Sequence, residues 1–122
     1  MAAMKILPLL VSAALLGAVL ALPNYVDLIP NGANVRLPCS GSVCAVGHQN
    51  PAGEGALNAF GYDFASAGRK WTQALCLQDS DGDGVSNGQE LGDPECVWRV
   101  GESPARSSDI SNPGVNENNV KC

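Results

Sequence analysis

The sequence is poor in the residues on which many catalytic and nucleic-acid-binding sites depend. It has one histidine, His48, and only seven Lys and Arg residues against twelve Asp and Glu residues, which gives a formal net charge of −5. A basic surface for nucleic acid or an anionic membrane is therefore not expected. No Ser lies in a nucleophile motif, and one imidazole is too few for a copper oxygenase site. We do not expect an enzyme.

Long hydrophobic runs are also scarce, and the one that exists lies at the start. Residues 1–21 carry a single charge, Lys5, ahead of apolar residues that end at Ala21. This layout is typical of a secretory signal peptide. A membrane anchor is the alternative because the apolar stretch approaches spanning length, but Pro8 interrupts it and no basic cluster follows. We therefore expect residues 22–122 to be secreted as one domain.

The cysteines lack the paired C-x-x-C spacing that zinc sites use. Five follow the signal segment: Cys39, Cys44, Cys76, Cys96 and Cys122. In an oxidising compartment they predict disulfides. Such cross-links suit a chain with only two Phe, two Trp and two Tyr. Because five is an odd number, one thiol is free or pairs with another chain.

One stretch, residues 59–76, has helical periodicity. Its apolar face is formed by Phe60, Phe64, Ala67, Trp71 and Leu75. The spacing of three and four residues predicts one helix, bent at Gly68 if at all, with Asn58 as its N-cap and the aromatic rings in the core. Turn residues elsewhere predict loops and short strands. Residues 101–122 form a polar tail that Cys122 can hold to the body.

Residues 79–90 match the pattern D-x-D-x-D-G-x5-E without a gap. The expected oxygen ligands are Asp79, Asp81, Asp83, the backbone carbonyl of Val85, Asn87 and Glu90. Alternate residues of a tight loop can turn their oxygens toward one centre, and Gly84 permits the sharp turn. The set holds hard oxygen donors and no soft ligand, which favours calcium over a transition metal. The alternative is an acidic turn that binds no ion.

Two features separate this loop from a paired EF-hand. Ser86 stands where EF-hands have a bulky apolar residue, and Gly92 and Pro94 leave no room for a long exiting helix. The pattern therefore predicts a solitary loop after a helix, as in thrombospondin type 3 repeats, with a structural ion. The fold class that we expect is a small disulfide-rich domain, α+β or irregular, in which one main helix leads into this loop.

Several motifs resemble the temptin family over nearly all of residues 22–122. They are Leu28–Gly32, Gly47-His48-x-Asn50, Phe60-Gly61-x-Asp63-Phe64, Ala67-Gly68-x-x-Trp71-Thr72, Leu75-Cys76, and Asp79 to Pro94 with Cys96-x-Trp98. Temptins are secreted molluscan proteins of water-borne pheromone complexes, so the resemblance implies a signal that acts with other secreted peptides or a receptor. It also implies the disulfides Cys39–Cys76 and Cys96–Cys122, with Cys44 as the extra thiol. Gly53-Glu54-Gly55 departs from the consecutive glycines of the family.

A calcium-binding component of extracellular matrix or mineralised tissue is the other interpretation. Without Lys5 the chain has six basic and twelve acidic residues, a net charge of −6, whereas matrix proteins of that kind are usually repetitive or more acidic. Three residues are candidates for partner contacts. Trp98 lies beside the acidic loop, His48 is otherwise expected as a hydrogen-bonded turn residue, and Cys44 could form an intermolecular disulfide.

Overall fold

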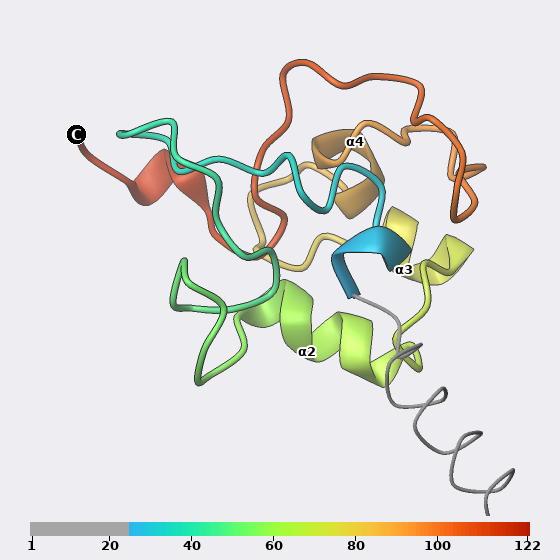
Figure 1. Cartoon of the computed structure of the whole chain (residues 1–122), viewed down its shortest axis with the longest axis horizontal. Helices are drawn as coiled ribbons and strands as arrows, with labels where there is room; N and C mark the ends of the chain where they lie inside the picture. Colours follow the sequence, from blue (N-terminus) through green and yellow to red (C-terminus); the bar gives the residue numbers. More distant parts are fainter. Residues whose placement is uncertain (1–24) are drawn as a thin grey trace, which may run out of the picture.

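The computed structural model describes residues 25–122, and the predicted signal segment 1–21 lies outside the described residues. Short helices are joined by loops (Figure 1): η1 (Tyr25–Leu28), α2 (Ala59–Ser66), α3 (Gln73–Leu77), α4 (Asn87–Glu90) and η2 (Glu117–Asn119). The predicted short strands do not form within residues 25–122, where strand pairing is limited to the isolated bridges Arg36–Val43 and His48–Leu57. No helix of the described part is long and apolar enough to cross a membrane.

The predicted helix over residues 59–76 is two helices, so the single-helix prediction is wrong. The start is as expected, because the Asn58 side chain accepts a hydrogen bond of 3.0 Å from the Gly61 amide. Helix α2 ends at Ser66, since Gly68 and Arg69 adopt φ angles of +77° and +57°. Two left-handed residues in succession end the helical hydrogen-bond ladder and redirect the chain. Helix α3 then begins anew behind the N-cap Thr72.

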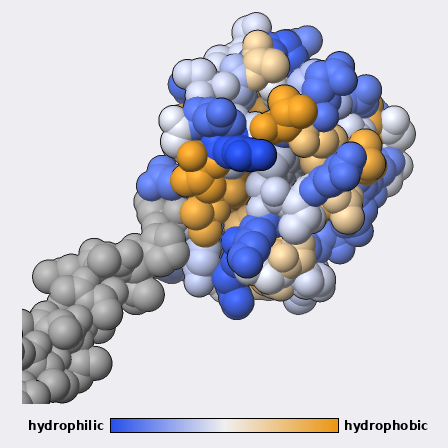
Figure 2. All heavy atoms as spheres, turned by 90° about the vertical axis from the view of Figure 1, so that its right-hand side faces the viewer, coloured by the Kyte–Doolittle hydropathy of each residue, from blue (hydrophilic) through white to orange (hydrophobic). Residues whose placement is uncertain are grey.

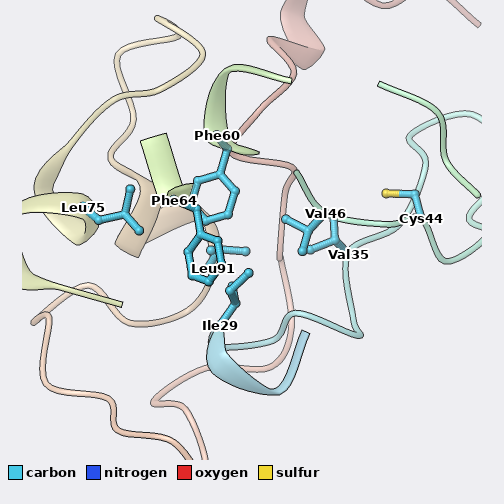
Figure 3. Packing of buried hydrophobic residues seen from close by; sticks show 8 residues of the cluster. All are labelled: Ile29, Val35, Cys44, Val46, Phe60, Phe64, Leu75 and Leu91. Atoms are coloured by element: carbon cyan, nitrogen blue, oxygen red, sulfur yellow. The ribbon is translucent and has the colours of Figure 1, made fainter. Parts of the chain in front are cut away.

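The core is formed by one small cluster of side chains from α2, α3, the residues that directly follow η1 and α4, and the loop over residues 35–46 (Figure 3). Its buried members are Ile29, Val35, Cys44, Val46, Phe60, Phe64, Leu75 and Leu91. Of the aromatic residues predicted to lie in the core, Phe60 and Phe64 are 0 % and 7 % exposed, as predicted, whereas Trp71 is only partly buried against the cluster. Helix α2 also contacts the loop before it closely. A Cβ at Gly61 would lie 2.0 Å from the Gly47 carbonyl oxygen, so only glycine fits there.

The structure uses the four expected half-cystines but pairs them differently. The disulfides are Cys39–Cys122 and Cys76–Cys96, so the pairing Cys39–Cys76 and Cys96–Cys122 that the resemblance implied is wrong. Cys76 is fully buried in α3, and the turn at Asp93 brings the Cα of Cys96 to 5.7 Å from it. Cys39 instead meets the tail, which also contacts the body through the Arg106 amide and the Gly92 carbonyl.

Cys44 is the unpaired thiol, as expected, but it is not available for a bond to another chain. Its side chain is only 5 % exposed and lies at one edge of the core (Figure 3). The Asn112 side-chain amide lies 3.8 Å from its sulfur. The predicted intermolecular disulfide would therefore require this part of the core to open.

Candidate functional site

The acidic loop spans the short distance between α3 and α4, and hydrogen bonds fix both of its ends. The Asn87 amide donates to the Gln78 carbonyl at 2.8 Å, which closes the base of the loop. At the start of α4, Ser86 and Gln89 form a capping box, in which each side chain accepts from the backbone amide of the other residue. Loop residues 79–85 are thus held between two helix ends that contact each other.

The three aspartates of the loop converge on one place. One carboxylate oxygen from each of Asp79, Asp81 and Asp83 lies within 4.8 Å of the others. The Asp79 carboxylate also accepts from the Gly82 amide at 3.0 Å and the Gly84 amide at 2.8 Å, which folds the loop around it. Three carboxylates at such distances repel one another unless a proton or a cation lies among them.

Glu90 on α4 lies beside these aspartates and interacts with Asp83, but its carboxylate does not belong to the group of oxygens within 4.8 Å of one another. Its side chain is 3 % exposed, and its Oε2 atom has no hydrogen-bond partner, nor has the buried Oδ2 of Asp81. Burial, reinforced by a hydrogen bond with Asp83 and by the charges of the aspartates, raises the pKa of Glu90 to about 9. Burial and the neighbouring Asp83 likewise raise the pKa of Asp81 to about 7. The protein alone thus leaves these two carboxylates poorly satisfied.

These residues fit a hard divalent cation. Two buried carboxylate oxygens lack partners, and the donor set contains only oxygen, the ligand type that calcium and magnesium prefer. Three converging carboxylates with a fourth beside them suit the larger, less demanding coordination of calcium. No histidine or cysteine joins the cluster within residues 25–122.

Asn87, one of the predicted ligands, has other partners in this structure. It is fully buried, and its Nδ2 donates to the Leu75 carbonyl at 2.8 Å and to Ser80 Oγ at 2.9 Å. Its Oδ1 accepts from the Ser80 amide at 3.3 Å. Its side chain therefore ties the loop to α3. Val85, whose carbonyl was predicted to be a ligand, lies at the exposed rim of the loop.

The three candidate contact residues lie in different environments. His48 lines a cavity of about 340 Å³ beside Phe60 and has a buried Nδ1 without a partner. Trp98 is half-buried, and its indole N–H donates to the Glu102 carbonyl at 2.8 Å. Cys44 is enclosed in the core. They do not form one site.

The role of Asp93 could not be predicted from the sequence. This carboxylate is 1 % exposed and connects two distant segments. Its Oδ2 accepts from the Trp71 indole at 2.8 Å and from the Trp98 amide at 3.1 Å, and its Oδ1 accepts from the Val97 amide at 3.0 Å. In sequence Asp93 is one more acid after the calcium pattern. Only the Asp-Pro pair, which favours a turn, marks it.

Comparison with known proteins agrees with the motifs. Residues 19–115 match the family described as Temptin C-terminal. The chain is 58 % identical over 104 residues to Temptin of Aplysia californica, an alignment that covers 84 % of this chain and 83 % of that protein. No solved structure matches. With most of its length covered in both comparisons, the chain belongs to the temptin family.

Proposed function

We propose that the chain is a secreted, non-enzymatic, calcium-binding signalling protein that acts in a water-borne pheromone complex with other secreted peptides. The observation that carries the proposal is the 58 % identity to Temptin over most of both chains. The two disulfides support it, because such bonds persist in oxidising, extracellular surroundings. The converging carboxylates of the acidic loop support the assignment of a structural ion.

Calcium would act on the loop between α3 and α4. Its ligands would be carboxylates of Asp79, Asp81, Asp83 and Glu90, with the Val85 carbonyl, and the ion would neutralise their mutual repulsion. Since the loop joins α3 to α4, an ion there also steadies the helix that carries Cys76 and, beyond α4, the turn at Asp93. Bound calcium would therefore stabilise the turn at Asp93, whose carboxylate accepts hydrogen bonds from the Trp71 indole and the Trp98 amide.

Calorimetric titration of the oxidised protein with calcium tests the ion. We expect one site per chain with a dissociation constant of about 10⁻⁴–10⁻³ M, as for other extracellular loops. Asp81→Ala and Glu90→Gln should abolish the heat, while Glu54→Gln, an exposed Glu outside the loop, should leave it unchanged. Absence of heat in the wild type would remove calcium from the proposal.

An attraction assay tests the signal. The purified oxidised protein is offered to conspecific animals alone, with the co-secreted peptides, and as peptides without the protein. We expect attraction by the combination to exceed that of either part, and to be lost when the disulfides are reduced and alkylated. A protein that adds nothing to the peptides, but binds calcium carbonate crystals, would support the matrix interpretation instead.

A further inference from the structure

Half of the Lys and Arg residues in the described part of this acidic protein lie in one place. A groove of about 380 Å³ lies between the turn that follows α2 and the segment at Trp98, and its lining includes Arg69, Lys70 and Arg99. Residues 25–122 contain only six Lys and Arg residues, so half of them line this groove, and no acidic residue does. Its local field is thus opposite in sign to the net charge of the chain.

The three cationic side chains of the groove are free of ion pairs to carboxylates in the described part of the chain. Within residues 25–122 none of them forms a salt bridge to a carboxylate. Arg69 lies over the Tyr25 ring at 5.7 Å from its centroid, and Lys70 is exposed. The nearest acid along the chain from Arg99 is Glu102, whose carboxylate accepts from the Arg99 amide at 2.8 Å. Asp27 on η1 is exposed to solvent and is not part of the lining.

The walls of the groove are apolar and held in position. Trp71 and Trp98 face it together with Leu28 and Val100. Both indole N–H groups donate to the protein, Trp71 to the buried Asp93 carboxylate and Trp98 to the Glu102 carbonyl, each at 2.8 Å. With their polar ends engaged, the rings can offer apolar surface at little entropic cost on binding, as aromatic anchors in protein interfaces do.

The helix break places the cations beside these rings. The left-handed Gly68 and Arg69 end α2, so that Arg69, Lys70 and Trp71 lie on a turn next to segment 97–100. Both segments lie on the right-hand side of Figure 1, and Figure 2 views the molecule from that side. On this face hydrophobic side chains lie directly beside strongly hydrophilic ones.

We propose that this surface, the basic Trp groove, binds an acidic peptide segment that carries a large apolar side chain. The cations would attract the acids, and the Trp walls would take the apolar group. A polyanion such as nucleic acid is not favoured, because only three cations line the groove and the chain has a net charge of −5. The inference rests on the proposed function, since it assigns the groove to one of the co-secreted peptides.

Fluorescence anisotropy with synthetic peptides tests the groove. The probe is a short, capped, dye-labelled peptide of Glu and Asp with one central Phe, measured on the oxidised protein in calcium buffer. Two control peptides replace the acids by Lys or the Phe by Ser. We expect the acidic Phe peptide to bind, more weakly at high salt, and both controls to bind at least roughly tenfold more weakly.

Matched lysine variants locate the binding. Lys70→Glu should weaken the acidic Phe peptide roughly tenfold, because it replaces an attraction by a repulsion. Lys121→Glu makes the same change of charge at an exposed lysine outside the groove and should bind like the wild type. Both lysines are exposed, so the melting temperatures of the variants should match that of the wild type and show that the fold is intact.

The outcomes separate the groove from the proposed function. The proposal that the groove binds an acidic peptide is overturned if the acidic Phe peptide does not bind. It is also overturned if both lysine variants lose affinity for this peptide equally. Self-association that Lys70→Glu abolishes would assign the groove to a second copy of this chain and also overturns it. If the co-secreted peptides bind the wild type, Lys70→Glu and Lys121→Glu equally, the proposed binding groove is wrong and the proposed function is supported. If the co-secreted peptides bind none of these proteins, while the synthetic peptide binds as expected, the proposed binding groove is supported and the proposed function is wrong.

Discussion

Substitution of Glu90 by Gln should stabilise the metal-free protein and abolish its response to calcium. Gln has nearly the shape of Glu but cannot ionise. In the metal-free fold Glu90 is 3 % exposed, has an unpartnered Oε2 and has a pKa raised to about 9 from an ordinary value of 4.5. The folded state holds this proton more tightly than the unfolded state does. The contribution of Glu90 to the free energy of unfolding is therefore fully present below pH 4.5 and is lost as the pH rises toward 9.

The magnitude follows from the interval between the ordinary pKa and the working pH. Each pH unit above 4.5 removes about 1.4 kcal/mol of stability, so the loss reaches about 3 kcal/mol at pH 7. Glu90→Gln avoids this loss, but its own amide lies in the same poorly satisfied place and offsets part of the gain. We expect a net gain of about 1–2 kcal/mol, which raises the melting temperature by roughly 4–16 °C in a domain of this size.

Thermal unfolding of both proteins in EDTA and in 10 mM calcium measures the effect. Calcium should stabilise the wild type by about 1.4–2.7 kcal/mol if its dissociation constant is about 10⁻³–10⁻⁴ M, and should not change Glu90→Gln. In EDTA the wild type should lose more stability between pH 5 and pH 8 than the variant does. A Glu90→Gln protein that melts below the wild type in EDTA, or that gains as much from calcium, would refute the reasoning.

Three other predictions concern the scaffold. Removal of Cys39–Cys122 by double Ala substitution should lower the free energy of unfolding by about 4.5 kcal/mol, and removal of Cys76–Cys96 by about 3 kcal/mol. The difference is expected because the bonds span 83 and 20 residues, and the longer ring restricts the unfolded chain more. Urea unfolding measures both losses, and a larger loss for Cys76–Cys96 would contradict this explanation. The Cys44 thiol, whose pKa is raised by burial and by Glu117, should react with a disulfide reagent only as fast as the fold opens; prompt reaction in the native protein would contradict its burial. Gly61→Ala should cost about 1–3 kcal/mol in urea unfolding because its Cβ would meet the Gly47 carbonyl, whereas Ser66→Ala on the exposed face of the same helix should be nearly neutral.

The sequence was informative where a local pattern has one structural solution. The N-cap Asn58 and the burial of Phe60 and Phe64 follow from neighbouring residues alone, and the structure has them as predicted. The aspartates of the acidic loop converge because alternate residues in a tight turn must face the same centre. The ion itself remains a prediction.

The sequence was misleading where distant segments decide the outcome. Gly68 keeps the phase of the apolar face, so periodicity could not show that Gly68 and Arg69 leave the helical region. The disulfide pairing depends on the turn at Asp93, which no single segment specifies. The basic Trp groove also could not be predicted from the sequence. Arg69 and Arg99 are 30 residues apart, so in the sequence they are only scattered charges on an acidic chain.

The two disulfides form nested rings, since Cys76–Cys96 lies entirely inside the ring closed by Cys39–Cys122. This nesting determines what an extracellular protease can remove. A single cut anywhere from residue 40 to residue 121 opens a ring but releases no fragment, because both new ends stay attached through a disulfide. A protein with one such cut stays covalently linked until a second cut or a reductant separates the fragments.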